Sequence, residues 1–249
     1  MTVATYQTLN FGSNPTLIDG PSTLGSGVIV PNFKAGHVAY GDCESEYVYV
    51  KVTLGSTAAF LPGQLYVVDD DYNATLISTT NSPRGSKVVV CQANSLGAQP
   101  VGVYYLWMLR AGQSPVAYTT LTTNNLTETT ATAGALNSPS TPTTTSKLIS
   151  GLYFTKAPAT FTATVTNGST VLTGPFTGVS TGSGPFAGAA ISGTGIAGGA
   201  TIAAVNVAGN VVQSITMSAA ATASGSAIVV TPSLVGEARV MWPFVDKTN

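Results

Sequence analysis

The sequence predicts an all-β fold, namely a small antiparallel β-barrel or sandwich with a second β module inserted near its C-terminus. Short segments rich in β-branched and aromatic residues recur roughly every 10 to 15 residues, with Gly, Pro, Asn or Asp turn signals between them. No segment carries the sustained 3.6-residue apolar period that an amphipathic helix requires.

The composition excludes several classes of partner. Charged residues are only 8% of the 249 residues, and the net charge is -1, against roughly 25% charged residues in an ordinary soluble domain. Without a basic stripe, a nucleic-acid partner is not expected. No run reaches the ~18 apolar residues of a spanning helix, so no membrane partner is expected either. Met1–Thr5 lacks a basic and an apolar region, which predicts no secretory signal and synthesis in the cytoplasm.

Six segments before residue 120 are predicted to be strands. The clearest is Tyr47–Leu54, whose alternation predicts a strand with one face on a core. Val48, Val50, Val52 and Leu54 share one face, and Tyr47, Tyr49, Lys51 and Thr53 share the other. The remaining segments are Gly27–Pro31, Leu65–Val68, Ala74–Ser78, Lys87–Ala93 and Gly102–Gly112.

Two later stretches differ in composition. In residues 119–145, twelve of the 27 residues are Thr and Glu128 is the only charge. This pattern fits either a flexible linker or an extended arm lying along a neighbouring subunit. Residues 157–236 contain no Asp, Glu, Lys or Arg, and alternation returns at Ala200–Val207, Val211–Met217 and Ala227–Thr231. Gly209–Asn210 is a turn signal between the first two, so a self-contained β module is expected.

Two glycine motifs match enzyme patterns only in their letters. Gly193–Gly198 has the form G-x-G-x-x-G, but a strand pattern follows it, whereas a dinucleotide site needs a helix there. Gly178–Gly182 has the form G-x-S-x-G, but a nucleophile elbow needs a later His, and the only His is His37. We therefore expect no catalytic residues, no cofactor-binding residues and no cofactor.

The remaining polar and aromatic candidates have structural interpretations that we prefer. His37 is expected in a loop or an interface. Asp69–Asp71 is expected to be a solvated hairpin turn rather than part of a Ca²⁺ site, which would need six or more oxygen ligands. Asp42, Glu44 and Glu46 alternate and are expected to face solvent, rather than to pair for glycoside hydrolysis. No metal site is predicted.

The aromatic and sulfur side chains are likewise assigned to packing. Tyr104, Tyr105 and Trp107 are expected to fill the core and a contact between subunits, rather than to stack on sugars. Cys43 and Cys91 lie 48 positions apart. The preferred interpretation is two buried thiols, and a disulfide between them stays open.

Several segments, taken in order, resemble small β-barrel capsid decoration proteins of tailed phages. They are Gly63–Val68 (GQLYVV), Arg84–Ala93 (RGSKVVVCQA), Gly102–Tyr104, Leu126–Leu136 (LTETTATAGAL) and Leu148–Thr155. In those proteins a last strand with a W/Y-P-x-V ending follows soon afterwards. Here Trp242–Val245 (WPFV) matches that ending about 80 residues late. The delay predicts a barrel domain over 1–160, with a Thr-rich arm at 119–145, completed by 233–249 and interrupted by an inserted module over 161–232.

The inserted module itself resembles repeats of phage fibre and tail proteins, at Ile191–Ile196, Thr201–Ile202 and Ile215–Gly225. Together, the resemblances imply a non-enzymatic virion protein on the capsid surface. It would bind the major capsid protein, cement the shell and form a homo-oligomer, a trimer in many such proteins. The alternative is a head-fibre or tail adhesin that contacts host glycans. The scarcity of aromatic residues in the module argues against a sugar site.

Overall fold

The computed structural model describes residues 18–22, 31–41, 44–93, 95, 98–121, 125–138, 145–156, 160–177, 185, 188–208, 211–233 and 235–248. Every regular element in these ranges is a β-strand, so the predicted all-β class is confirmed. Within the described part, no helix is long and apolar enough to cross a membrane.

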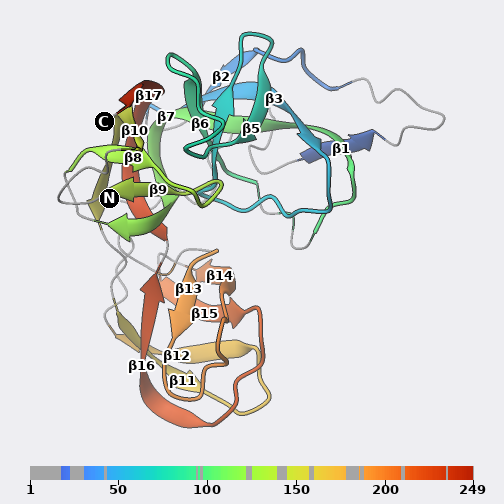
Figure 1. Ribbon diagram of the computed structural model, residues 1–249. Coiled ribbons are helices and arrows are strands. Elements are labelled where there is room, and N and C mark those ends of the chain that lie inside the picture. Colours follow the sequence, from blue (N-terminus) through green and yellow to red (C-terminus); the bar gives the residue numbers. More distant parts are fainter. Residues whose placement is uncertain are drawn as a thin grey trace. The chain divides into compact units, whose positions relative to one another are not determined.

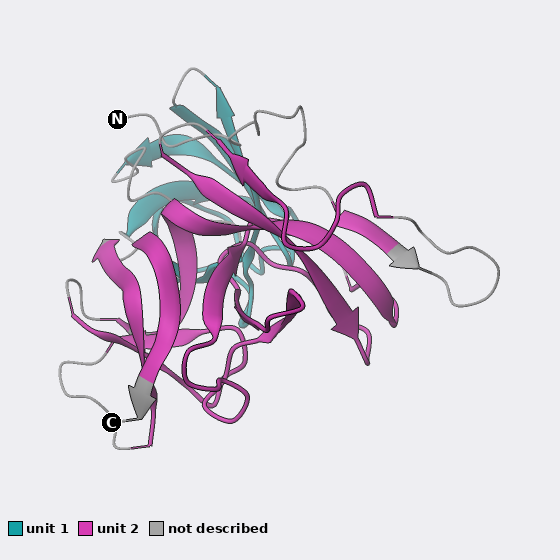
Figure 2. Cartoon of the chain, turned by 90° about the horizontal axis from the view of Figure 1, so that it is seen from above, with its two compact units in different colours: residues 1–5, 156–237 teal, residues 6–155, 238–249 magenta. Residues whose placement is uncertain are grey.

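The strands divide between two compact units, which Figure 2 colours separately. Among the described residues, the host unit (magenta) holds the chain up to Thr155 and again from Ala238. The inserted unit (teal) holds Lys156–Glu237. The expected junctions were at residues 161 and 232, each about five residues inside the limits of the inserted unit.

The host unit is one sheet, in the order β1-β7-β9-β8-β10-β17-β6-β4-β5-β3-β2 (Figure 1). Its strands are β1 (Ile18–Ser22), β2 (Val38–Tyr40), β3 (Glu46–Leu54), β4 (Leu65–Val68), β5 (Asn73–Leu76), β6 (Lys87–Cys91), β7 (Gly102–Leu121), β8 (Thr127–Thr129), β9 (Leu136–Ser138), β10 (Lys147–Lys156) and β17 (Val235–Thr248). β3–β5 and β7–β9 are parallel pairs, and the other pairs of known direction are antiparallel.

Strand β7 organises the host unit, because it is hydrogen-bonded to β1, β3, β6, β9 and β17. It lies antiparallel to β3 from the pair Leu54–Gly102 to the pair Glu46–Ala111. Its last residues run parallel to β9. The pairings close two circuits that share this strand, β7-β6-β4-β5-β3 and β7-β9-β8-β10-β17. Such closure leaves few strand edges open to unwanted pairing.

Strands β3, β4, β6 and the first half of β7 are largely buried on both faces, which corrects the expectation for Tyr47–Leu54. Val48 and Val50 belong to one core cluster. Tyr47 and Tyr49, on the opposite face, are only 2% and 1% exposed and belong to another. The prediction of one packed face holds only towards the end of the strand, where Thr53 is exposed. Tyrosine looks polar in an alternating pattern, but its ring buries a large apolar area.

The Thr-rich stretch is neither a linker nor an arm where the structure describes it. Residues 127–129 and 136–138 form β8 and β9, which lie inside the host sheet. The Thr127 hydroxyl donates to the carbonyl oxygens of Ile149 and Leu152, at 3.1 and 3.0 Å. Threonine is therefore used here as a buried strand residue whose hydroxyl completes backbone hydrogen bonds, which composition alone does not reveal.

The inserted unit is a six-stranded sheet in the order β13-β16-β11-β12-β15-β14. The strands are β11 (Phe161–Val165), β12 (Val171–Thr177), β13 (Ala190–Ser192), β14 (Ile202–Ala208), β15 (Val211–Met217) and β16 (Gly225–Ser233). The ends of this order meet through a bridge between Ala190 and Thr201. The enclosed core contains Phe161, Leu172, Ile191, Ile215 and Met217.

Between Lys156 and Glu237 the inserted unit has no charged residue, and serine hydroxyl groups accept hydrogen bonds from backbone N–H groups in its connections. The Ser224 hydroxyl accepts from the backbone N–H of Asn167, and the Ser218 hydroxyl accepts from that of Thr201, both at 2.9 Å. The low charge of residues 157–236 is thus compatible with satisfied backbone groups. The expected turn at Gly209–Asn210, and residues 27–30 of the first expected strand, lie outside the described residues.

Deleting residues 157–236 and joining the ends with a short Gly-Ser linker should leave a folded host unit. The reason is that β10 and β17 are hydrogen-bonded neighbours, and paired strands lie only about 5 Å apart. Circular dichroism should show a β spectrum and a cooperative thermal transition. A spectrum without β structure would mean that the host unit depends on the insertion.

Candidate interaction surface

The acidic residues before β3 do not share one environment. Asp42 lies outside the described residues, and Glu44 is exposed. Glu46 is 5% exposed, so the expectation that all three carboxylates face solvent was wrong for Glu46. Glu46 is the first residue of β3 and pairs with Ala111 of β7.

Glu46 joins three strands through its carboxylate. One oxygen accepts a hydrogen bond from Nη2 of Arg110 on β7, within an ion pair. The other accepts from Nε1 of Trp242 on β17, at 2.7 Å. A buried carboxylate is tolerated when it is paired and hydrogen-bonded. Each carboxylate oxygen of Glu46 therefore has a hydrogen-bond partner. The only hydrogen-bond donor of the indole, Nε1, is already bonded within the chain.

Trp242 is placed outward by a break in the alternation of β17. From Ala238 to Val240 and from Pro243 to Val245, buried and exposed residues alternate, but Met241 and Trp242 are consecutive and both exposed. Trp242 has a φ of 45°, in the left-handed region that bulky residues rarely adopt. A bulge-like irregularity of this kind changes the direction of a side chain, and here it leaves Trp242 61% exposed.

Other large apolar side chains are exposed near the same place. Tyr40 on β2 is the cross-strand partner of Glu46 and is 58% exposed. Met241 and Phe244 flank Trp242 on β17 and are 41% and 42% exposed. We call Tyr40, Met241, Trp242 and Phe244 the Trp242 surface. Apolar side chains grouped on an otherwise polar surface are typical of interaction sites.

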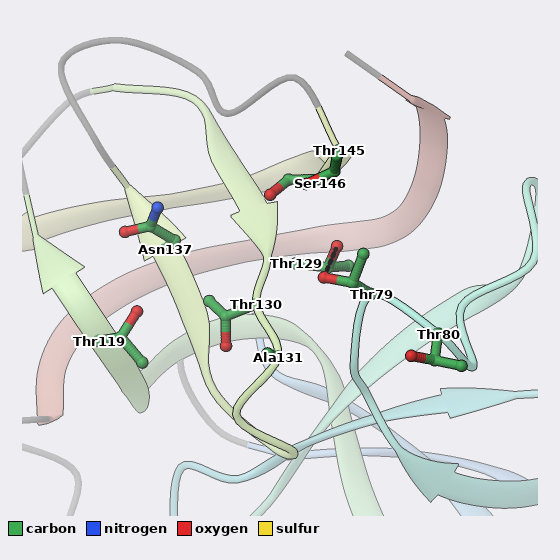
Figure 3. Close-up of a pocket in the computed structure, with 9 residues that line it drawn as sticks. All are labelled: Thr79, Thr80, Thr119, Thr129, Thr130, Ala131, Asn137, Thr145 and Ser146. Atoms are coloured by element: carbon green, nitrogen blue, oxygen red, sulfur yellow. Dashed lines mark hydrogen bonds between the residues drawn. The ribbon is translucent and has the colours of Figure 1, made fainter.

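A separate hollow of about 530 Å³ is lined almost entirely by hydroxyl groups (Figure 3). Its walls come from β7, β8 and the residues after it, β9, the two residues before β10 and the segment after β5. The nine lining residues are Thr79, Thr80, Thr119, Thr129, Thr130, Ala131, Asn137, Thr145 and Ser146. The hydroxyls of Thr79 and Thr129 bond to each other at 3.2 Å, and that of Thr130 is engaged with the backbone of Thr132.

Some polar groups that line the hydroxyl hollow are therefore already hydrogen-bonded within the chain. Nδ2 of Asn137 donates to Glu128 at 2.9 Å, while its Oδ1 is buried without a partner. No charged side chain lines the hollow. Hydroxyls without an adjacent base or a nearby charge can donate and accept hydrogen bonds, but they are not activated as nucleophiles.

A second hollow, of about 510 Å³, brings together two features that the sequence analysis treated separately. His37 lies beside the Asp69–Asp71 turn, because Lys34–His37 and Asp70–Tyr72 line it together. Gly36 has a φ of 91°, and a Cβ there would come within 2.4 Å of the Tyr72 ring, so this contact needs glycine. Among the described residues, no three His, Cys, Asp or Glu side chains converge as metal ligands would.

The acidic turn Asp69–Asp71 connects β4 and β5 as a hairpin, and its first residue, Asp69, stabilises it. Oδ1 of Asp69 accepts from the backbone N–H groups of Asp71 and Asn73, at 3.0 and 2.8 Å. Desolvation opposes the ionised form, but these hydrogen bonds and the one from the Asn73 amide outweigh it and lower the pKa of Asp69. The expectation of a hairpin turn at Asp69–Asp71 is confirmed.

The glycine motifs have no enzyme geometry where they are described. Gly193–Gly198 forms turns between β13 and β14, and strand β14 follows where a dinucleotide site would need a helix. Gly195 has a φ of 78°, as a turn glycine does. The Gly178–Gly182 motif lies outside the described residues.

The three aromatic residues of β7 pack mainly into the host unit, which confirms the core assignment for Tyr104 and Trp107. Tyr104 is buried in one core cluster, and its hydroxyl donates to the Pro100 carbonyl at 2.7 Å. Trp107 is buried in the other cluster, with the ring of Phe33 at 5.1 Å. Tyr105 is half-buried and stacks on Tyr49. The expected contact of these side chains between subunits stays a prediction.

Cys91 is a free, buried thiol, as expected, while Cys43 lies outside the described residues. Burial raises the pKa of the Cys91 thiol from 9.0 to about 12. Burial also raises the pKa of Tyr66, which belongs to the same core cluster. A thiol of this kind is a packing residue rather than a nucleophile.

Comparisons of the chain with protein-family models, curated proteins and solved structures found no significant match.

Replacing Glu46 with Ala should lower the free energy of unfolding by about 2 kcal/mol, since charge-assisted hydrogen bonds contribute about 1.5–3 kcal/mol and Arg110 would lose its counter-charge. Urea unfolding would measure the loss. Glu44→Ala, two residues earlier and exposed, is the matched control and should stay within about 0.5 kcal/mol of wild type. Equal effects of the two substitutions would refute a special role for Glu46.

Stability should fall above pH 9. The folded thiol of Cys91 stays protonated up to about pH 12, whereas the unfolded thiol ionises near 9.0, so the unfolded state loses the proton first. Cys91 alone should then cost about 2 kcal/mol between pH 8 and pH 10.5. Urea unfolding at both pH values, with Cys91→Ala as control, would show a smaller pH effect in the variant. An identical pH effect would contradict this assignment.

Proposed function

We propose that this chain is a virion structural protein that binds the outer surface of a phage capsid and stabilises the shell. The role is structural and needs no catalytic residue or cofactor. The expected partner is the major capsid protein, and the expected state is a homo-oligomer, with a trimer as the form that the resemblance implies. The expected location is the capsid surface of the virion.

The observation that carries the proposal is the order of the resembling segments within one unit. Five of them coincide with strands that precede the insertion, and the last coincides with β17, which follows it. These segments are Gly63–Val68 at β4, Arg84–Ala93 at β6, Gly102–Tyr104 at β7, Leu126–Leu136 at β8–β9, Leu148–Thr155 at β10 and Trp242–Val245 at β17. β17 is hydrogen-bonded beside β10, although about 80 residues separate them in sequence.

The physical character of the chain supports the same role. With only 8% charged residues, the surface offers little charge repulsion to a neighbouring subunit. A protein that binds only the expanded shell stabilises that shell by mass action. Many identical sites on a lattice then add up, even when each single contact is weak.

The alternative, an adhesin with the inserted unit as its tip, rests on the resemblance of that unit to fibre repeats. An aromatic platform for sugar rings would favour it. The described aromatic residues of the inserted unit are Phe161 and Phe176, whose rings pack against each other at 6.2 Å. The exposed large apolar residues described there are Val171, Val207, Val211 and Val229. Valines can form a protein contact, so the insertion remains the place to look for a host contact.

The purified protein should co-sediment with expanded empty capsids of its phage that lack it. Binding should saturate at a copy number that matches the symmetry sites of the lattice, because each equivalent site takes one copy or one oligomer. Quantifying bound protein per shell would measure this number and give the oligomeric state.

Binding of only a few copies per shell would favour a fibre or tail position, and the inserted unit would then be tested on a glycan array. No binding to shells would overturn the decoration role.

A further inference from the structure

We propose that the Trp242 surface is where the host unit docks on its partner, and that this partner is a different folded protein with an apolar recess that receives the indole. The inference rests on the proposed function, which makes that partner the capsid subunit.

The indole is already held in the conformation it would present. Nε1 donates to Glu46 at 2.7 Å, and Glu46 is fixed by Arg110. The backbone of Trp242, at a φ of 45°, adopts a strained conformation that only a specific local structure maintains. A side chain that is ordered before binding loses little conformational entropy on docking, and this favours affinity.

The same hydrogen bonds define the chemistry of the recess. Because Nε1 already has an acceptor within the chain, the exposed part of the indole offers only apolar ring surface. Arg110 pairs with the Glu46 carboxylate, so a partner that covers Trp242 does not bury an unpaired charge. The matching recess is therefore apolar and needs neither a hydrogen-bond acceptor nor a cation. Buried tryptophans in such recesses are typical hot spots of protein interfaces.

A second copy of this chain is a poor occupant. In the part of the chain that the structure describes, one of the two hollows above is lined mainly by hydroxyl groups and the other includes four ionisable side chains, Lys34, His37, Asp70 and Asp71, so neither is an apolar recess for an indole. The four residues of the surface are exposed by 58%, 41%, 61% and 42%, which amounts to on the order of 400 Å².

A standard interface buries about 800 Å² on each partner. Two copies joined only through this surface would therefore form a weak pair. On a shell that presents the same recess many times, a homo-oligomer of this chain compensates for a small single contact, because its linked copies bind several recesses at once.

The test compares Trp242→Ala with wild type in binding to expanded empty shells assembled without this protein. The variant should bind at least about tenfold more weakly, as expected for a hot-spot residue. Val101→Ala is the matched control, since Val101 is also an exposed apolar residue but adjoins Gly102, at the opposite end of the β3–β7 pair from Glu46. It should bind as wild type does.

Fluorescence gives a second readout, because the chain contains only two tryptophans, Trp107 and Trp242. Trp107 is buried and Trp242 exposed, so acrylamide quenching of the wild type should fall when shells are added. If Trp242→Ala does not fold by circular dichroism, Tyr40→Ser tests the same surface from β2.

Three results would overturn the inference, and they are distinguishable. Wild-type affinity of Trp242→Ala, or of Tyr40→Ser, would reject this surface while leaving the proposed function intact. Self-association that depends on Trp242, measured by sedimentation velocity without shells, would replace the named partner with a second copy. Failure of the wild type to bind shells would overturn the proposed function and, with it, the partner named here.

Discussion

Everything else in the host unit depends on the hydrogen bonding of one long strand, β7. Because β7 pairs with five strands, it belongs to both closed circuits, and its two faces contribute to both core clusters. Leu106 and Met108 face one cluster, and Trp107 and Leu109 face the other. A strand with this position cannot slip by one residue, since a slip would exchange the side chains of the two cores. The register with β3 therefore also fixes where Glu46 lies.

Glu46 connects this framework of strands to the exposed Trp242 side chain. β3 supplies the carboxylate, β7 supplies Arg110, and β17 supplies Trp242. The three strands are remote in sequence, so only the completed sheet assembles this group. In contrast, the hydroxyl hollow and the acidic turn consist of polar groups whose hydrogen bonds mostly serve the local fold. In its described part, the host unit thus combines polar regions that complete the fold with the apolar Trp242 surface.

The strands were predictable from sequence where the pattern is local. Leu65–Val68 has the predicted limits of β4, and Val211–Met217 has those of β15, because β-branched residues there end at turns. β8 and β9 were missed because each has only three residues and both lie in a Thr-rich stretch whose composition resembles a linker. The burial of Tyr47 and Tyr49 was missed because it depends on β9, β10 and β17, which share their core cluster. The Glu46–Arg110–Trp242 group had no signal in the sequence, since Arg110 and Trp242 lie 64 and 196 positions from Glu46.

The place of the insertion also affects how the protein forms during synthesis. The circuit β7-β9-β8-β10-β17 lacks its last member until residues beyond 237 have been made, whereas all six strands of the inserted unit are made before that. The ribosome adds roughly 5–20 residues per second, and domains generally fold as units during synthesis. For several seconds, the growing chain therefore carries an incomplete host unit with unpaired edges on β10, while the inserted unit already has every strand it needs. Because the inserted unit can fold early, the time in which both units expose unpaired β-strands in one nascent chain is shortened.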